Sequence, residues 1–179
     1  MEKKKIVMDA EGIDRSLTRI AYEILEKNKG VEKLVLVGIQ TGGVFLAERL
    51  RRKISEIEGR GIPLGILDIT LYRDDLQTSH LKPRLGKTDI SFSLNDKKVV
   101  LVDDVLFTGR TIRAAMDALI DFGRPRSIQL TVLIDRGHRE LPIRADFVGK
   151  NLPSSLWEAV SVDLTEKNGR DEVVVVLNG

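Results

Sequence analysis

Short segments that are apolar at nearly every position most restrict the folds open to this chain. The clearest are LVLVGI at 34–39 and VVLV at 99–102. A strand that is apolar on both faces has to be covered on both faces, which is typical of a parallel sheet between two layers of helices. Amphipathic helical patterns are found at 13–25, 44–54 and 109–122. Further strands are expected at 61–72, at 127–134, within 143–151 and at 172–177, so that helices and strands alternate along the chain. The sequence therefore predicts an α/β fold with a parallel twisted sheet flanked by helices.

Length and composition narrow the class of protein. The chain has 179 residues, which suits one domain, 1–179, with a continuous core. It contains no cysteine, which excludes disulfides and thiol nucleophiles. No segment approaches the roughly 18 apolar residues of a membrane span, so we expect a cytoplasmic protein without a membrane partner. The net charge of +2 leaves a polyanionic partner open. The polar stretch 73–89 lacks periodicity and predicts a flexible loop or arm at about 72–90.

Three polar segments, GIQTGG, LYRDDL and DDVLFTGRT, each follow an expected strand. Ligands of such sheets bind beyond the carboxyl ends of the strands, so these segments are expected to surround one crevice. The paired carboxylates of Asp103 and Asp104 suit two vicinal hydroxyls or a hydrated divalent cation. Residues 107–111 turn into a helix whose first amides suit a phosphate monoester. Together they predict a site for a ribose 5′-phosphate. The alternative is that the two aspartates only end a strand and cap a helix.

The segment VVLVDDVLFTGRT resembles the phosphoribosyl-pyrophosphate (PRPP) motif of type I phosphoribosyltransferases. The segments LVGIQTGG, DITLYRDDL, DALIDFGRP and DRGHRELPIRADFVGKNLP are similar to one group among them, the bifunctional pyrimidine-operon attenuation regulators with uracil phosphoribosyltransferase activity. The resemblance covers nearly the whole chain. It implies the type I phosphoribosyltransferase fold, with a small hood and a flexible loop or arm. It also implies the reaction of uracil and PRPP to UMP and diphosphate, with Mg²⁺ carried by PRPP and no metal site of the protein's own.

The same resemblance implies roles for individual residues. Asp103 and Asp104 would hold the ribose hydroxyls, and Arg73 would fold over the leaving diphosphate, although it is also readable as a solvated loop charge. These three are the candidate catalytic residues. The candidate substrate contacts are Thr41, Gly42, Asp103, Asp104, Val105, Leu106, Phe107, Thr108, Gly109, Arg110, Thr111, Arg136 and Val160.

One position departs from the family pattern. Members of the family read Thr-Arg-Gly in the diphosphate loop, where this chain reads Thr41-Gly42-Gly43. The loop of the family also tends to contain a cis peptide bond that does not involve proline. Because Gly42 offers no guanidinium to the departing diphosphate, we expect a weakened transferase, and Gly42→Arg is expected to raise its rate.

The resemblance also implies binding of a stem-loop in the leader of pyrimidine-operon mRNA. At 100° per residue, Arg15, Thr18, Arg19 and Tyr22 lie about 140° to 240° from the apolar face that begins at Ile13. Such a stripe suits phosphates and an unstacked base, and it equally suits a plain solvated helix face. The candidate RNA contacts implied by the family are Thr18, Arg19, Tyr22, Lys27, His138, Arg139, Arg144, Lys150 and Ser154.

Two classes of function remain open from these residues. One is an RNA-binding regulator whose partners are PRPP, uracil, UMP and the leader mRNA, and which is expected to form a homo-oligomer, a dimer or a higher even assembly. The other is a phosphoribosyltransferase whose basic surface is incidental. A purine- or orotate-specific transferase is a weaker third reading, because the PRPP motif is shared among these enzymes.

Overall fold

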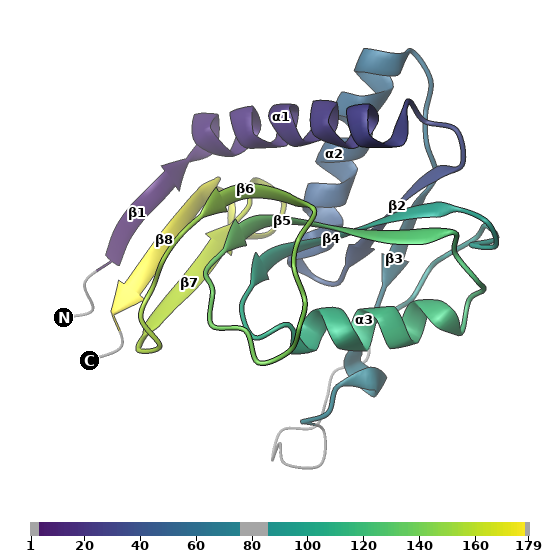
Figure 1. Ribbon diagram of the computed structural model, residues 1–179. Coiled ribbons are helices and arrows are strands. Elements are labelled where there is room, and N and C mark those ends of the chain that lie inside the picture. The colour runs from purple at the N-terminus through teal and green to yellow at the C-terminus, as the bar shows by residue number, and fades with distance from the viewer. Residues whose placement is uncertain (1–3, 76–85, 178–179) are drawn as a thin grey trace.

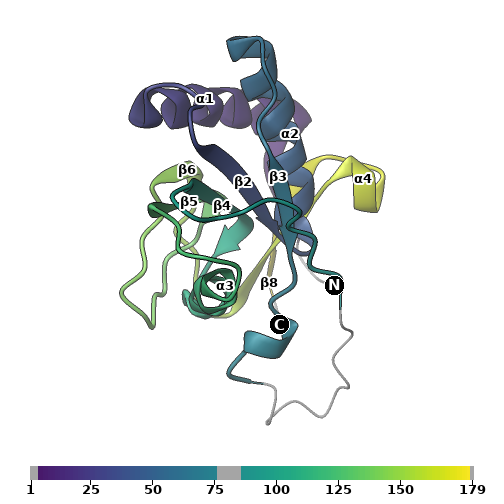
Figure 2. The same cartoon turned by 90° about the vertical axis from the view of Figure 1, so that its right-hand side faces the viewer.

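A computed structural model describes residues 4–75 and 86–177 of the chain. The middle of the predicted loop or arm, 76–85, lies outside the described residues. A twisted five-stranded sheet forms the centre, with helices on both faces (Figure 1). Figure 2 shows the same layers from the side; α1 and α2 pack on one face of the sheet and α3 packs on the other. The predicted α/β class, with helices flanking a twisted sheet, is confirmed.

The central sheet is parallel throughout, as the apolar segments predict. Its strands stand in the order β3-β2-β4-β5-β6. Their bounds are Leu64–Leu67 for β3, Leu34–Ile39 for β2, Lys98–Leu106 for β4, Ser127–Asp135 for β5 and Phe147–Asn151 for β6. In β2, Leu34 and Leu36 pack into the cluster formed with α1 and α2, while Val35 and Val37 pack toward α3. The alternation explains why both faces of β2 must be apolar.

Three helices cover this sheet: α1 (Ala10–Asn28), α2 (Gly42–Glu58) and α3 (Arg110–Ile120). Helix α1 begins where the Asp9 carboxylate accepts the Gly12 N–H at 2.8 Å, a side-chain N-cap. The predicted apolar face is confirmed, since Ile13 and Ile24 are fully buried. Tyr22, on the opposite side, is 57% exposed.

A second, three-stranded antiparallel sheet stands beside the first one and occupies the place expected for the hood (Figure 1). It consists of β1 (Lys4–Asp9), β8 (Glu172–Leu177) and β7 (Glu158–Asp163), with β8 in the middle. A short helix, α4 (Thr165–Asn168), connects β7 to β8. The terminal strand at 172–177 was predicted, while β1 and β7 were not.

The second predicted strand, 61–72, is wrong in its length. Only β3 is extended, and a turn of 3-10 helix, η1 (Thr70–Tyr72), follows it. The reason is Asp68, whose Oδ1 accepts the Thr70 N–H at 3.1 Å and its hydroxyl at 2.6 Å, and this local bonding turns the chain. Strand β4 is in turn longer than expected and continues through the two aspartates to Leu106.

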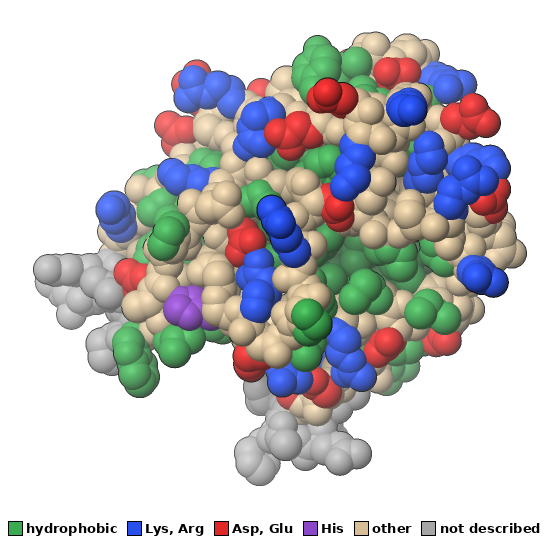
Figure 3. All heavy atoms as spheres, in the orientation of Figure 1, with side chains coloured by type: hydrophobic (Ala, Val, Ile, Leu, Met, Phe, Trp, Pro, Cys, Tyr) green, Lys and Arg blue, Asp and Glu red, His purple; other side chains and the backbone are tan. Residues whose placement is uncertain are grey.

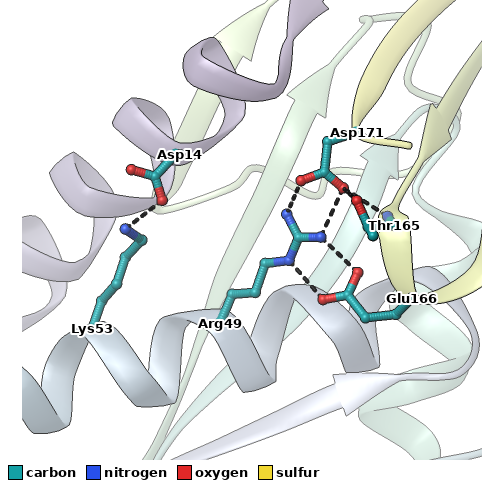
Figure 4. A network of polar contacts seen from close by, with 6 residues as sticks. All are labelled: Asp14, Arg49, Lys53, Thr165, Glu166 and Asp171. Carbon is teal, nitrogen blue, oxygen red and sulfur yellow. Dashed lines mark hydrogen bonds and ion pairs between the residues drawn. The ribbon is translucent and has the colours of Figure 1, made fainter. Parts of the chain in front are cut away.

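An ion-pair network fastens α4 and the start of β8 to α2 (Figure 4). Arg49 donates through Nε and Nη2 to Glu166 at 2.8 and 2.6 Å, and through both Nη atoms to Asp171 at 2.8 Å. Beside it, Lys53 of α2 binds Asp14 of α1 at 2.7 Å. Both helices above the sheet are thereby connected to their neighbours by charge as well as by apolar packing.

The part of the chain that the structure describes contains no helix long and apolar enough to cross a membrane.

Candidate functional site

The carboxyl ends of β3, β2 and β4 bring the three predicted segments to one edge of the sheet. The loop after β2 lies directly against β4: a Cβ at Gly43 would stand 2.2 Å from the Val102 carbonyl, and one at Gly42 would stand 2.3 Å from Asp104 Oδ2. Two glycines are therefore what allows the loop to lie this close to the aspartates. The Gln40–Thr41 peptide bond is cis, as the resemblance implies.

The two aspartates lie in unlike surroundings at the end of β4. Asp103 is only 7% exposed and its Oδ1 accepts the Asp104 N–H at 2.9 Å. Asp104 is half-buried, and its Oδ1 accepts the N–H of Val105 at 2.7 Å. Burial first, and the charge of Asp104 next, raise the pKa of Asp103 well above its usual range. The pair therefore holds one negative charge more readily than two.

Asp103→Asn is expected to raise the free energy of unfolding at pH 7, by about 1 kcal/mol. A carboxyl whose pKa is raised by folding stabilises the fold fully below its unfolded pKa, and loses that contribution as the pH rises through its folded pKa. The amide keeps the acceptor for the Asp104 N–H and removes the titration. Urea unfolding at pH 7 and pH 4 measures this. A variant that is less stable than wild type at pH 7 would show that the buried carboxylate is stabilising.

The phosphate loop, residues 106–111, leads from β4 into α3. Gly109 adopts a positive φ of 92° at the N-cap position of α3, a backbone conformation that glycine favours. The Thr108 hydroxyl accepts the Arg110 N–H at 3.3 Å. The first amides of α3 beyond this turn have no helical partners, which suits an anion such as a 5′-phosphate.

Arg73, the predicted clamp, is ion-paired within its own loop. Its Nε and Nη2 donate to Asp75 at 2.9 and 2.5 Å. The adjacent Asp74 accepts from Arg110 of α3 at 2.6 Å, so the start of this loop is attached to the phosphate loop. A role of Arg73 at the diphosphate would require it to exchange its Asp75 partner.

Arg136 is the centre of the predicted base-binding region. Its guanidinium lies 4.1 Å above the Phe107 ring and donates to the Ser154 hydroxyl and to the carbonyls of Ser155 and Glu158 at 2.8–2.9 Å. Burial lowers the pKa of Arg136, and the charge of Glu158 partly offsets this. Val160 of β7 packs against the same core as α1 and α2. Sequence reasoning placed Phe107 in the loop but missed that it stacks on Arg136.

A cavity of about 530 Å³ opens beside Arg136. It is lined at the ends of β5 and β6 by Asp135, Arg136, Gly137, His138, Arg139, Asn151, Pro153 and Ser154. The rings of His138 and Phe107 meet edge-on, with their centroids 5.8 Å apart, and His138 Nε2 is hydrogen-bonded to the Ser154 carbonyl. Three of the predicted RNA contacts, His138, Arg139 and Ser154, therefore border the region predicted to hold the base.

Of the remaining predicted RNA contacts, four lie on α1, Lys150 lies on β6, and Arg144 lies in the segment before β6. Arg19 Nη2 donates to the Gly149 carbonyl at 2.7 Å, which joins α1 to β6, and Lys150 donates to the Val7 carbonyl of β1 at 3.0 Å. Lys27 is paired with Asp146 at 2.5 Å. A second cavity, of about 610 Å³, is lined by Ile6, Val7, Met8, Asp9, Gly12, Arg15, Ser16, Arg19, Gly149 and Lys150. Figure 3 shows Lys and Arg side chains interspersed with Asp and Glu over this face.

Most of the predicted RNA contacts thus belong to two groups that meet at β6. One group consists of the residues of α1 together with Lys150, and the other consists of His138, Arg139 and Ser154. Lys150 lines the cavity beside α1, and the next residue, Asn151, lines the cavity beside Arg136. Thr18 uses its hydroxyl to bond the Asp14 carbonyl and to accept from Lys53. Among the described residues, Arg144 makes no hydrogen bond through its side chain.

Sequence reasoning missed Asp135, which binds Arg139 at 2.5 Å. It follows the apolar segment 127–134 as Asp103 follows 99–102, and that shared position was the available signal. Within residues 4–75 and 86–177, no group of three or more His, Asp or Glu side chains is placed to hold a metal ion.

Known proteins resemble this chain over nearly its full length. The model of the phosphoribosyl transferase domain matches residues 5–167. The bifunctional protein PyrR of Clostridioides difficile is 59% identical over 98% of this chain and 99% of its own, and that of Pelotomaculum thermopropionicum is 62% identical over 97% and 96%.

Solved structures share the fold at lower identity. A hypoxanthine-guanine phosphoribosyltransferase of Bacillus anthracis superposes with a TM-score of 0.73 at 19% identity, covering 96% of both chains. A hypoxanthine phosphoribosyltransferase of Trypanosoma cruzi gives a TM-score of 0.74 at 22% identity, covering 96% of this chain and 94% of its own. The domain match and the identity to the PyrR proteins agree with the crevice of two aspartates and a phosphate loop: the chain belongs to the phosphoribosyltransferase family and, within it, to the bifunctional PyrR proteins.

Proposed function

We propose that this chain regulates pyrimidine-operon transcription by UMP-dependent binding of leader mRNA, and that it also converts uracil and PRPP to UMP and diphosphate. The identity of about 60% to bifunctional PyrR proteins over nearly the whole chain is the observation that carries this proposal. The crevice supports the enzymatic part, and the groups on α1 and β6 support the RNA-binding part.

In the transferase reaction, the N1 nitrogen of uracil loses its proton and forms a bond to the anomeric carbon of PRPP, the bond from that carbon to diphosphate breaks, and positive charge develops on the sugar. Asp103 and Asp104 accept hydrogen bonds from the two ribose hydroxyls, and the negative charge of the pair stabilises the developing cation. The phosphate loop holds the 5′-phosphate, while Thr41 and Gly42 line the diphosphate. PRPP brings Mg²⁺ as part of the substrate. The residues therefore act by orienting two substrates and by electrostatics rather than by covalent chemistry.

The base would lie beside Arg136 and Val160. The guanidinium of Arg136 is held over the Phe107 ring by three acceptors, so its position is set before a ligand arrives. Arg73 would leave Asp75 and close over the diphosphate, which would exclude water from the reacting carbon.

A base-competition assay tests the enzymatic part. With PRPP and Mg²⁺, uracil is expected to be converted to UMP, and hypoxanthine, guanine and orotate are expected to be poor substrates. Turnover of hypoxanthine above that of uracil would favour the purine-specific reading, which the fold alone also allows. Uracil turnover without RNA binding would favour the reading of an enzyme whose basic surface is incidental.

Gly42→Arg is expected to raise kcat for uracil, by about tenfold or less, because it supplies a guanidinium to the leaving diphosphate. The structure adds a condition: a side chain at this position requires Asp104 to turn away from the loop. Gly42→Ala is the matched control, since it displaces Asp104 without adding charge. A rate for Gly42→Arg at or below that of Gly42→Ala would contradict the expectation that Gly42 weakens the enzyme.

For RNA, the two groups of basic residues form one proposed surface that runs from Arg19 across Lys150 to His138. Phosphate contacts make such affinity fall steeply with salt. A homo-oligomer, a dimer or a higher even assembly, would repeat this surface and is part of the proposal. Exposed apolar side chains such as Leu71, Ile120 and Trp157, the last 78% exposed, are consistent with further contacts between subunits.

A further inference from the structure

The segment that follows β5, residues 136–143, lies along the phosphate loop and bonds its backbone. The Arg136 N–H donates to the Leu106 carbonyl at 3.0 Å, and the Glu140 N–H donates to the Thr108 carbonyl at 2.9 Å. The loop that is proposed to hold the 5′-phosphate is therefore hydrogen-bonded to the segment that carries two predicted RNA contacts, His138 and Arg139.

The Arg139 side chain adds a further connection between the phosphate loop and the segment 136–143. Its Nη1 donates to the Phe107 carbonyl at 2.9 Å and to the Gly137 carbonyl at 3.3 Å. Its Nε donates to the Ile143 carbonyl at 2.9 Å, and its Nη2 donates to Asp135 Oδ2 at 2.5 Å. The guanidinium thus makes four hydrogen bonds inside the protein, and the side chain is 23% exposed. A guanidinium offers five N–H donors, so one remains for a ligand outside the protein.

The acceptors of Arg139 explain its geometry. Three are backbone carbonyls on different parts of the loop and the segment, and the fourth is a carboxylate at the end of β5. Only the planar fork of an arginine reaches such a set at once, because an ammonium is a single point of donation. The Phe107 carbonyl is the acceptor that belongs to the phosphate loop, in the middle of the turn between the aspartates and α3.

We propose that Arg139 is a positioning residue for the phosphate loop, through which occupancy of the nucleotide site is coupled to the RNA-binding segment 136–143. This inference rests on the proposed function. The bond to Phe107 fixes the peptide that precedes Thr108, and so the direction of the amides that receive the 5′-phosphate of PRPP or UMP. A phosphate that orders the loop also orders Arg139 and its segment, and RNA bound on that segment favours the same arrangement. Such coupling is reciprocal: UMP strengthens RNA binding by the factor by which RNA strengthens UMP binding.

Arg139→Lys separates positioning from charge, because lysine keeps the positive charge for RNA and loses the fork. For this variant, the Kd of UMP and the KM of PRPP are expected to rise about tenfold, and kcat at saturating PRPP is expected to stay within about threefold of wild type. Its affinity for leader RNA without UMP is expected to exceed that of Arg139→Met, because lysine keeps the charge, while the gain produced by UMP is expected to disappear. Arg139→Met should give the same change in UMP binding and a weaker affinity for RNA.

The measurements are calorimetry with UMP, steady-state kinetics with uracil and PRPP, and RNA titration with and without UMP on the full chain. Arg124→Lys is the matched control, since its exposed side chain makes no hydrogen bond among the described residues, and it is expected to match wild type throughout. If Arg139→Met does not fold, Arg139→Lys decides the question alone.

The outcomes separate the positioning role from the proposed function. Unchanged UMP Kd and PRPP KM in Arg139→Lys, with weaker RNA binding, would make Arg139 a plain RNA contact and would overturn the inference. Equal gains from UMP in the variant and wild type would overturn the coupling. If wild type binds no RNA, the regulator function fails, while a raised UMP Kd in Arg139→Lys would still support the positioning of the loop.

Discussion

Asp104→Asn is expected to lower kcat/KM for PRPP by about one to two orders of magnitude. A hydrogen bond to a charged group contributes about 1.5–3 kcal/mol, and each 1.4 kcal/mol is a factor of ten in rate. The Asp104 carboxylate is proposed to accept a hydrogen bond from a ribose hydroxyl and to stabilise the cationic sugar. An uncharged amide does both less well. Because Asp104 is half-buried and already bonded to the Val105 N–H, the side-chain position is expected to persist in the variant. Steady-state kinetics with uracil in excess measures the change.

Asp117→Asn is the matched control for this prediction. Asp117 lies on α3, pairs with Arg113 at 3.4 Å and is half exposed. Its change to asparagine is expected to leave kcat/KM within about twofold of wild type. If Asp104→Asn also stays within that range, Asp104 does not hold the ribose, and the role proposed for it is wrong.

Arg49→Met is expected to lower the free energy of unfolding at pH 7 by about 2–3 kcal/mol, because it leaves two carboxylates in partly buried positions without their partner. Arg49 is 16% exposed and lies between Glu166 and Asp171, which connect α4 and β8 to α2 (Figure 4). The loss should fall on the hood, which has few other polar bonds to α2. Urea unfolding followed by circular dichroism measures it, with Arg52→Met as the control because the Arg52 side chain is 62% exposed.

The stability difference between wild type and Arg49→Met is expected to depend on pH, because Arg49 shifts the pKa values of its two carboxyl partners. The hydrogen bonds from Arg49 lower the pKa of Asp171 from 3.8 to about 2, and they also lower the pKa of Glu166. A carboxyl whose pKa is lowered by folding stabilises the fold above its unfolded pKa and loses that contribution as the pH falls through its folded pKa. The difference between wild type and Arg49→Met should therefore be full above about pH 5 and should shrink toward pH 2. A difference that is constant between pH 7 and pH 3 would assign the stabilisation to packing of the arginine side chain.

Apolar periodicity predicts the central sheet well because its strands are buried on both faces. The segment 34–39 matches β2 to the residue, and the helical face from Ile13 to Ile24 is the buried face of α1. In the hood, apolar periodicity predicts β8 but misses β1 and β7. Strand β1 begins with two lysines and is exposed over its first half, so nothing in its own composition marks it as a strand. Its place depends on pairing with β8, far away in the chain.

The residues of the candidate site also divide into those that the sequence predicts and those that it does not. Asp103, Asp104 and the phosphate loop are predictable because they lie in and directly after the carboxyl-terminal part of one strand, where sequence neighbours are also neighbours in space. Partners brought together by the fold were not predictable. The stacking of Arg136 on Phe107 and the bond from Arg139 to the Phe107 carbonyl join segments about 30 residues apart in sequence through the parallel pairing of β4 and β5. No local pattern encodes such contacts.

RNA binding with and without UMP tests the central claim most directly. The full chain is titrated against a pyrimidine-leader stem-loop and a scrambled RNA of equal length, at fixed salt and Mg²⁺, because phosphate contacts make affinity depend on salt. Tighter binding of the stem-loop than of the scrambled RNA, strengthened further by UMP, is the predicted result. Equal binding of the two RNAs, unaffected by UMP while uracil is still converted, would contradict the regulator and leave a phosphoribosyltransferase alone.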